Sequence, residues 1–164
     1  MKKYEFTGET ISFCGMILKR IRAVRDFNYV KKGDLGGYIE KEENLSHDGY
    51  AWVGENARVY ENARVFENAW VSDNSKIYGT AEVYGNACVF GNACVFENAC
   101  VFGNAWVYGN AWVGGNTETH GNWIFGEARI YSNKDLKEME RRDATRIEQR
   151  INRRNSLCGT PIRR

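Results

Sequence analysis

Five cysteines and two histidines are the side chains of this chain that could ligate a metal or act as nucleophiles and bases. Cys88, Cys94 and Cys100 lie six residues apart, and no two cysteines form a CxxC pair. A zinc site needs its ligands to converge at ~2.3 Å from one point. Whether the three thiols converge depends on the elements that carry them, so the surrounding repeat decides the chemistry.

That repeat occupies about half of the chain. From Ala51 to Asn133 the sequence repeats Ala-x-Val-x-Gly/Glu-Asn about fourteen times. So short and regular a repeat predicts a solenoid of very short strands, each turn stacked on the last. Alternation sends the first and third residues of a unit to one side of the strand, and the second and fourth to the other. Gly-Asn or Glu-Asn then turns the corner, because Gly and Asn tolerate positive φ.

The predicted core is a column of β-branched residues beside a column of small ones. The inward β-branched residues are Val53, Val59, Val65, Val71, Ile77, Val83, Val89, Val95, Val101, Val107, Val113, Ile124 and Ile130. Their small partners are Ala57, Ala63, Ala69, Ser75, Ala81, Ala87, Ala93, Ala99, Ala105, Ala111 and Ala128. This pairing suits a narrow interior in which backbones approach closely.

The pairs Val53 with Ala57 and Val59 with Ala63 place a small residue four positions after an aliphatic one. In this pattern the chain resembles the hexapeptide-repeat, left-handed parallel β-helix family. The resemblance implies left-handed coiling, with three six-residue units in each triangular turn. Segments 20–27, 32–40 and 43–46 are similar to the lead-in of YdcK-like bacterial and phage proteins. That similarity supports the fold and brings no activity with it.

Three units per turn place residues that are six apart on three different sides. Cys88, Cys94 and Cys100 are therefore expected to point away from one another. We predict no metal site and no cofactor, and we expect reduced thiols, as in the cytosol.

The whole chain is predicted to be an all-β solenoid with two appendages. Residues 1–50 are expected to form a β-rich cap, 51–133 the hexapeptide-repeat β-helix, and 134–164 an amphipathic basic helix and tail. The glycine-rich stretch 31–37 is read as a loop of the cap, because it lacks the Gly-Lys-Ser/Thr ending of a phosphate-binding loop. Ser132 is the predicted helix N-cap, with Asp135 as its partner. The apolar helix stripe comprises Leu136, Met139, Ala144, Ile147 and Ile151, and Gly159 and Pro161 mark the tail.

The charge distribution and the hydropathy limit the classes of partner that we expect. The net charge is +2, with −4 on residues 51–133 and +5 on residues 134–164. We expect the basic side chains of residues 134–164 to lie on a solvated helix face rather than to contact nucleic acid. No apolar run of ~20 residues is present, so no membrane span is expected. The start lacks the apolar stretch of a signal peptide, and a cytoplasmic location is predicted.

Stacked turns also align outward residues in columns. One column runs through the tryptophans on either side of Cys88, and a second column of aromatic residues lies beside it. We call these residues the aromatic strip: Trp52, Trp70, Trp106, Trp123, Phe90, Tyr108 and Phe125. Soluble monomers seldom expose an apolar patch larger than a few hundred Å². We expect the N-terminal segment, the C-terminal helix or another subunit to cover it. Self-association is favoured, as a trimer by analogy with the hexapeptide family.

Two functions follow. The first is a non-catalytic binding or assembly protein that uses the aromatic strip for self-association or for a protein partner, with a phage or mobile-element inhibitor of a host factor as one form of this hypothesis. The alternative is an acyl-CoA-dependent acyltransferase, as many hexapeptide-repeat proteins are, with His120 as general base beside Glu118. His120 lies in the five-residue unit 117–121, the only irregular one. Because no long loop interrupts the repeat to build an acceptor pocket, the non-catalytic reading is preferred. Only His47 and His120 are present, too few for a three-histidine zinc site.

Overall fold

The computed structural model describes residues 1–158, with side chains through Arg154. Three longer strands come first: β1 (Tyr4–Phe13), β2 (Met16–Ala23) and β3 (Leu35–Ile39), followed by a 3-10 turn at Glu42–Asn44. Short strands then follow: β4 (Trp52–Val53), β5 (Arg58–Val59), β6 (Arg64–Val65), β7 (Trp70–Val71), β8 (Lys76–Ile77), β9 (Glu82–Val83), β10 (Cys88–Val89), β11 (Cys94–Val95), β12 (Cys100–Phe102), β13 (Trp106–Val107), β14 (Trp112–Val113), β15 (Glu118–His120), β16 (Trp123–Ile124) and β17 (Arg129–Ile130). Helix α1 (Asn133–Cys158) closes the described chain.

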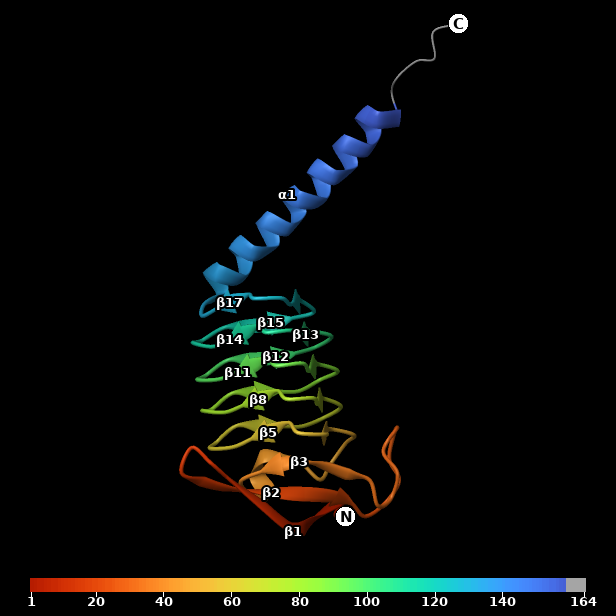
Figure 1. Ribbon diagram of the computed structural model, residues 1–164, viewed down its shortest axis with the longest axis vertical. Helices are drawn as coiled ribbons and strands as arrows, with labels where there is room; N and C mark the ends of the chain where they lie inside the picture. The colour runs from red at the N-terminus through yellow and green to blue at the C-terminus, as the bar shows by residue number, and fades with distance from the viewer. Residues whose placement is uncertain (159–164) are drawn as a thin grey trace, which may run out of the picture.

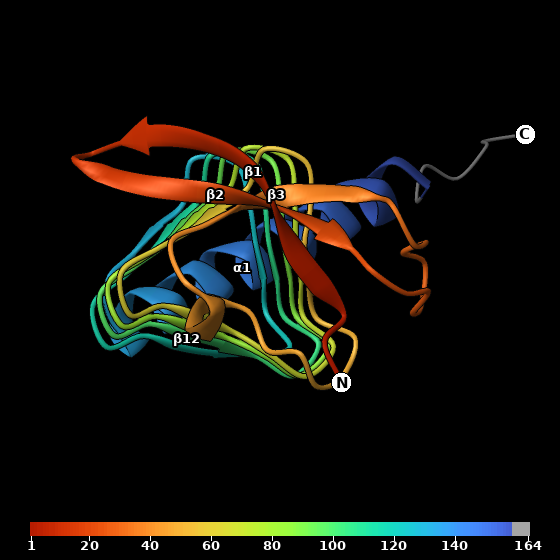
Figure 2. The same cartoon turned by 90° about the horizontal axis from the view of Figure 1, so that it is seen from below.

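The short strands coil into a parallel β-solenoid, which confirms the predicted architecture (Figure 1). Every third strand pairs with the next in parallel, so that Val71 lies beside Val89 and Val89 beside Val107. Three sheets result, in the orders β1-β2-β3-β5-β8-β11-β14-β17, β16-β13-β10-β7-β4 and β15-β12-β9-β6. Viewed along the axis, the coil has three sides (Figure 2). The left-handed coiling stays a prediction from the resemblance.

The core is the double column that the alternation predicts. Val53 through Val113, Ile124 and Ile130 are buried, as are the alanines beside them from Ala57 to Ala111. Thr119 takes the place of a valine in the irregular unit and is also fully buried, where its hydroxyl donates to the Cys100 carbonyl at 3.4 Å. The irregular unit is one residue short, and the connection between β15 and β16 is shorter to match. Trp106 still pairs with Trp123, so the ladder continues. The irregular unit therefore preserves the core.

The corners explain why Gly and Glu alternate at the fifth position of a unit. Non-glycine residues such as Glu61 and Glu97 have positive φ there, at 57° and 56°. The Glu61 carboxylate accepts the N–H of Gly79 in the next turn at 2.7 Å, and Glu97 accepts the N–H of Gly115. A left-handed conformation costs an L-residue roughly 1–2 kcal/mol. The charge-assisted bond to the turn above offsets that cost and ties successive turns together.

The N-terminal strands form a cap that extends one side of the solenoid. β1 and β2 form a hairpin turned at Cys14 and Gly15, and β3 pairs antiparallel with β2 and parallel with β5. The predicted loop at 31–37 is wrong at its end, because β3 begins at Leu35. Gly36 and Gly37 are needed in this strand by close packing: a Cβ on Gly37 would lie 2.5 Å from the Ala57 carbonyl oxygen.

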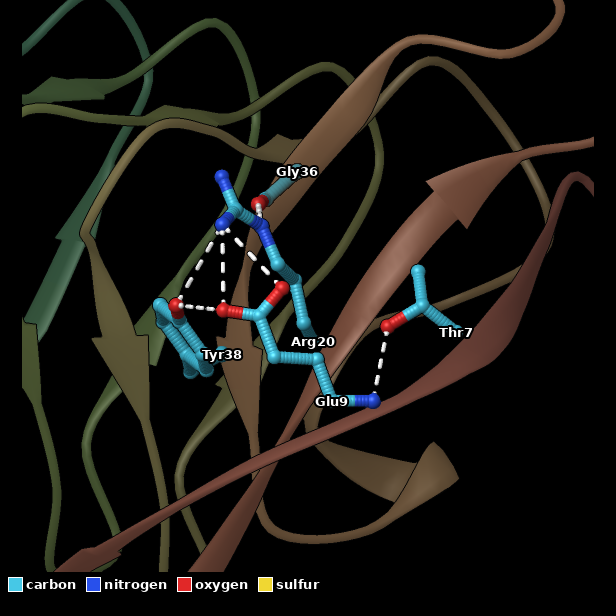
Figure 3. Close-up of polar contacts among 5 residues, drawn as sticks. All are labelled: Thr7, Glu9, Arg20, Gly36 and Tyr38. Carbon is cyan, nitrogen blue, oxygen red and sulfur yellow. Dashed lines mark hydrogen bonds and ion pairs between the residues drawn. The ribbon is translucent and has the colours of Figure 1, made fainter.

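A polar cluster fastens this hairpin to β3 (Figure 3). The Tyr38 hydroxyl donates to the Glu9 carboxylate at 2.8 Å, and the Arg20 guanidinium contacts both Glu9 oxygens at 3.3 Å. Arg20 also donates to the Gly36 carbonyl at 3.2 Å. The hydrogen bond from Tyr38 and the nearby Arg20 lower the pKa of Glu9. Residues from β1, β2 and β3 are thereby joined at one point.

The C-terminal end is closed only in part by α1. Ser132 caps the helix as predicted: its hydroxyl oxygen accepts the Asp135 N–H at 3.2 Å, and Asp135 accepts the Tyr131 N–H at 3.0 Å. Leu136 is buried and Met139 packs against the core. From Ala144 to Arg154 every described side chain is exposed, and the helix projects away from the last turn (Figure 1). The predicted tail at Gly159 and Pro161 lies outside the described residues.

Candidate binding surface

The predicted columns of the aromatic strip are present. Trp52 pairs with Trp70, Cys88 follows, and Trp106 pairs with Trp123 in the adjoining strand. The rings of Trp106 and Trp123 stack at 5.3 Å between centroids. Phe90 stacks on Tyr108 at 5.0 Å, and Tyr108 stacks on Phe125 at 5.5 Å. Stacked aromatic pairs of this kind stabilise successive strands.

Exposure rises along the strip toward its C-terminal end. Trp52 is 3% exposed, whereas Trp106 and Trp123 are 39% and 59% exposed. Trp70, Phe90 and Tyr108 are half-buried in between. The strip is therefore most exposed where it reaches the last two turns.

The N-terminal segment covers the other end of the strip, which was one of the three covers expected. Phe27 stands edge-on to Trp52 at 5.4 Å between ring centroids. Gly36 lies so close that a Cβ there would be 2.8 Å from the Trp52 ring. Trp52 points out of the coil yet is unavailable to a partner. Trp52, although predicted as a binding residue, therefore packs against the N-terminal cap.

The exposed end adjoins a groove that sequence reasoning missed. The groove, of about 380 Å³, lies between the last turn and α1 and includes Phe125, Met139, Arg142 and Arg146 in its lining. Phe125 is 47% exposed at this position. The sequence does not show the direction in which α1 leaves the last turn. A helix packed along the whole length of its apolar stripe would have filled this groove, but only the first two turns of α1 contact the solenoid.

His120, the candidate general base, continues a different stack. Its ring lies on Phe102 at 5.0 Å between centroids, above the pair formed by Phe102 and Tyr84. Among the described residues, no hydrogen bond or ion pair joins His120 to Glu118. The backbone N–H of Glu118 donates instead to the Asn133 side chain at 2.8 Å. The irregular unit thus anchors the start of α1, and the His–carboxylate pair is not assembled.

The three central cysteines occupy three different sheets. Cys88 lies in β10, Cys94 in β11 and Cys100 in β12, as the three-sided coil predicts. Burial raises the pKa of each of these thiols. Among the described residues, no group of three or more His, Cys, Asp or Glu side chains is placed to hold a metal ion. Raised thiol pKa values disfavour the reactive thiolate.

His47 and Lys3 form a buried polar cluster under the cap. The His47 ring stacks on Tyr4 at 4.1 Å, and its Nδ1 accepts the Lys3 N–H at 3.2 Å. The other nitrogen, Nε2, is buried without a hydrogen-bond partner, 3.9 Å from a Glu42 oxygen. Burial lowers the pKa of His47, and burial with the Arg25 charge lowers the pKa of Lys3 to about 8. These contacts join the start of β1 to the segment that leads into the solenoid, and burial disfavours the protonated form of His47.

Comparison with known proteins agrees with the architecture. Residues 57–73 match the family described as the YdcK beta solenoid repeat. These residues run from the first core alanine after β4 to the corner that follows β7. The match supports a YdcK-like β-solenoid family for this chain. A search of curated proteins finds no match to the chain.

Within the described residues, no helix has both the length and the apolar character that crossing a membrane requires. The described chain is a β-solenoid repeat protein with stacked aromatic clusters. Two of these clusters have exposed rings at the C-terminal end: Trp106, Trp123 and Phe125 in the strip, and Trp112 and Tyr131 beside Phe96.

Proposed function

We propose that this chain is a non-catalytic binding or assembly protein whose contact surface is the C-terminal part of the aromatic strip. One observation carries the proposal: at the last two turns Trp106 stacks on Trp123 and Phe125 stacks on Tyr108, with Trp106, Trp123 and Phe125 exposed. Tryptophan is the residue most enriched at interface hot spots, because it offers a large contact area with few rotatable bonds. The rigid solenoid beneath holds these rings in place before a partner arrives, which lowers the entropic cost of binding.

The finer parts of the proposal concern place and partner. A cytoplasmic location is supported by Cys14, Cys88, Cys94 and Cys100, which are free thiols, as expected in a reducing compartment. The partner is either another copy of the chain or a host protein. The resemblance of the lead-in segments to phage proteins supports a role as an inhibitor of a host factor.

The test replaces two exposed rings while sparing the core. Trp106→Ser together with Trp123→Ser removes the exposed part of the strip, and Trp112→Ser is the matched control. Trp112 is 38% exposed but lies in a different sheet. We expect the double variant to lose self-association or binding to proteins captured from the native host, with its far-UV circular dichroism unchanged. The control is expected to retain both. If the double variant assembles and captures partners like the wild type, the strip is structural only.

A further inference from the structure

The C-terminal end of the solenoid presents three edge strands, and they are closed unequally. β15 has its Glu118 and His120 N–H groups bonded to Asn133 and Asn122 side chains, each at 2.8 Å. β17 lies against α1, and the Tyr131 N–H at its end is bonded to Asp135. β16 pairs on one side with β13 and is the last strand of its sheet. Among the described residues, the Arg129 N–H of β17 also has no acceptor, but β16 is the edge on which neither outward N–H group is bonded.

The open edge of β16 has unpaired donors. In the turn below, the N–H groups of Trp106 and Tyr108 donate to carbonyls of the next turn at 2.8 and 2.9 Å. The equivalent groups one turn later are the N–H groups of Trp123 and Phe125, and within residues 1–158 neither has an acceptor. An exposed strand edge of this kind is a template for pairing with another strand.

The same edge is apolar on its outward face. Trp123 and Phe125 are the two most exposed members of the strip, and both adjoin the open edge. The groove against α1 is lined by Phe125 from this face, and farther along α1 the side chains of Ile147 and Ile151 are exposed. Figure 1 shows α1 rising away from the last turn, and we call the groove beneath α1 the wedge. Exposed aromatic side chains on β16 therefore lie beside two unpaired backbone donors.

We propose that a second copy of this chain occupies the wedge, pairing β16 with β16 across a two-fold axis to form a homodimer. Antiparallel pairing of identical strands is compatible with two-fold symmetry, because each residue meets its counterpart reciprocally. With Ile124 at the axis, Trp123 of one copy exchanges N–H···O bonds with the residue at position 125 of the other. Each Trp123 then packs against a phenylalanine as a cross-strand aromatic pair.

Charge favours a second copy as the occupant. The projecting part of α1, residues 144–154, has four arginines and one glutamate, a net charge of +3. The solenoid, residues 51–133, has a net charge of −4. Joined end to end, each basic helix extends alongside the acidic solenoid of the other copy, with its isoleucines turned toward that surface. Complementary charge of this kind orients the two copies and speeds their association. The N-terminal ends offer no such pairing, because β3 and the cap cover them.

This inference rests on the proposed function and names its partner. The experiment measures molar mass by sedimentation across a range of protein concentrations, together with amide hydrogen exchange of the segment 122–126. We expect the mass to rise from 18.8 kDa to twice that value as concentration increases. Exchange of segment 122–126 is expected to slow over the same range, whereas exchange of β7 and β10 stays constant.

Variants assign the contact. Trp123→Ser and Ile147→Glu are each expected to abolish the concentration-dependent doubling, while Trp112→Ser keeps it. Far-UV circular dichroism checks that each variant retains the solenoid. A strict monomer, a trimer, or a dimer whose segment 122–126 exchanges at the same rate as the monomer overturns the inference. A monomer that still binds a host protein through Trp106 and Trp123 overturns this inference alone. If self-association is unchanged in every variant of the aromatic strip, the proposed function is overturned as well.

Discussion

Trp52 and Trp123 occupy the same column, four turns apart, and offer a sharp test of the cap. Both are replaced by Ala in separate variants. Truncating a buried Trp costs about 3–5 kcal/mol of unfolding free energy, and Trp52 at 3% exposure belongs to that class. Trp123 at 59% exposure has roughly 100 Å² of side chain covered, from a total of up to about 250 Å². At about 25 cal/mol per Å², its loss costs at most about 2.5 kcal/mol.

The assay is urea unfolding followed by far-UV circular dichroism, at a protein concentration where the chain is monomeric. We expect the midpoint to fall further for Trp52→Ala than for Trp123→Ala, with equal slopes. Acrylamide quenching is an independent measure: removing Trp123 should eliminate an accessible emitter, and removing Trp52 a shielded one. Equal destabilisation, or a larger loss for Trp123→Ala, would refute the reasoning that the N-terminal segment seals the column at Trp52.

Three further outcomes are expected. His47 has a lowered pKa in the folded chain, so this histidine binds fewer protons when folded than when unfolded. The free energy of unfolding should therefore decline as pH falls below ~6.5. The variant His47→Phe should flatten this pH dependence in melting temperatures measured between pH 7.5 and 5. Gly85→Ala should cost about 1–3 kcal/mol more than Gly126→Ala in urea unfolding, because both have positive φ but only at Gly85 would a Cβ meet backbone, 2.8 Å from the Gly103 nitrogen. Tyr38→Phe should raise the pKa of Glu9 toward its ordinary value in carboxyl NMR titration, since the Tyr38 hydroxyl is the main cause of its lowering; an unchanged titration would contradict the cluster.

The repeat sequence predicted what depends on local periodicity. Alternation alone placed Val89 inward and Cys88 outward, whereas the eighteen-residue turn that placed Trp106 beside Cys88 came from the resemblance to hexapeptide-repeat proteins. Ser132 was identifiable as a helix cap because capping depends on residues three positions apart. These features are determined within one unit or between adjacent turns, so the sequence pattern contains them.

Features that depend on distant contacts were not predictable in the same way. Gly36 and Gly37 resemble loop residues in the sequence, yet they lie in β3 because the turn beneath leaves no space for a Cβ. The burial of Trp52 depends on Phe27, which no periodicity relates to the repeat. The stripe on α1 predicted an apolar face but not where its contact would end, since that depends on the angle at which the helix leaves the last turn.

The carboxylates at the corners and the backbone groups of the strands bear on which end of the solenoid can bind a partner. Glu61, Glu67, Asp73 and Glu97 each accept a hydrogen bond from the N–H of a glycine in the following turn, so at these corners the donor lies on the C-terminal side of its acceptor. The outward residues of the strands donate in the opposite direction, to the turn that follows, as the bond from the Tyr108 N–H to the Ile124 carbonyl shows. The edge of a parallel ladder exposes both N–H and C=O groups, so the last turn offers unpaired donors and acceptors together. At the first turn the chain supplied its own cap. At the last turn, within the described residues, side chains bond the outward N–H groups of β15 and the Tyr131 N–H after β17, but no side chain bonds the Trp123 or Phe125 N–H. The unpaired donors therefore coincide with the most exposed tryptophan, and this coincidence makes the C-terminal end the place where a partner gains both hydrogen bonds and apolar contact.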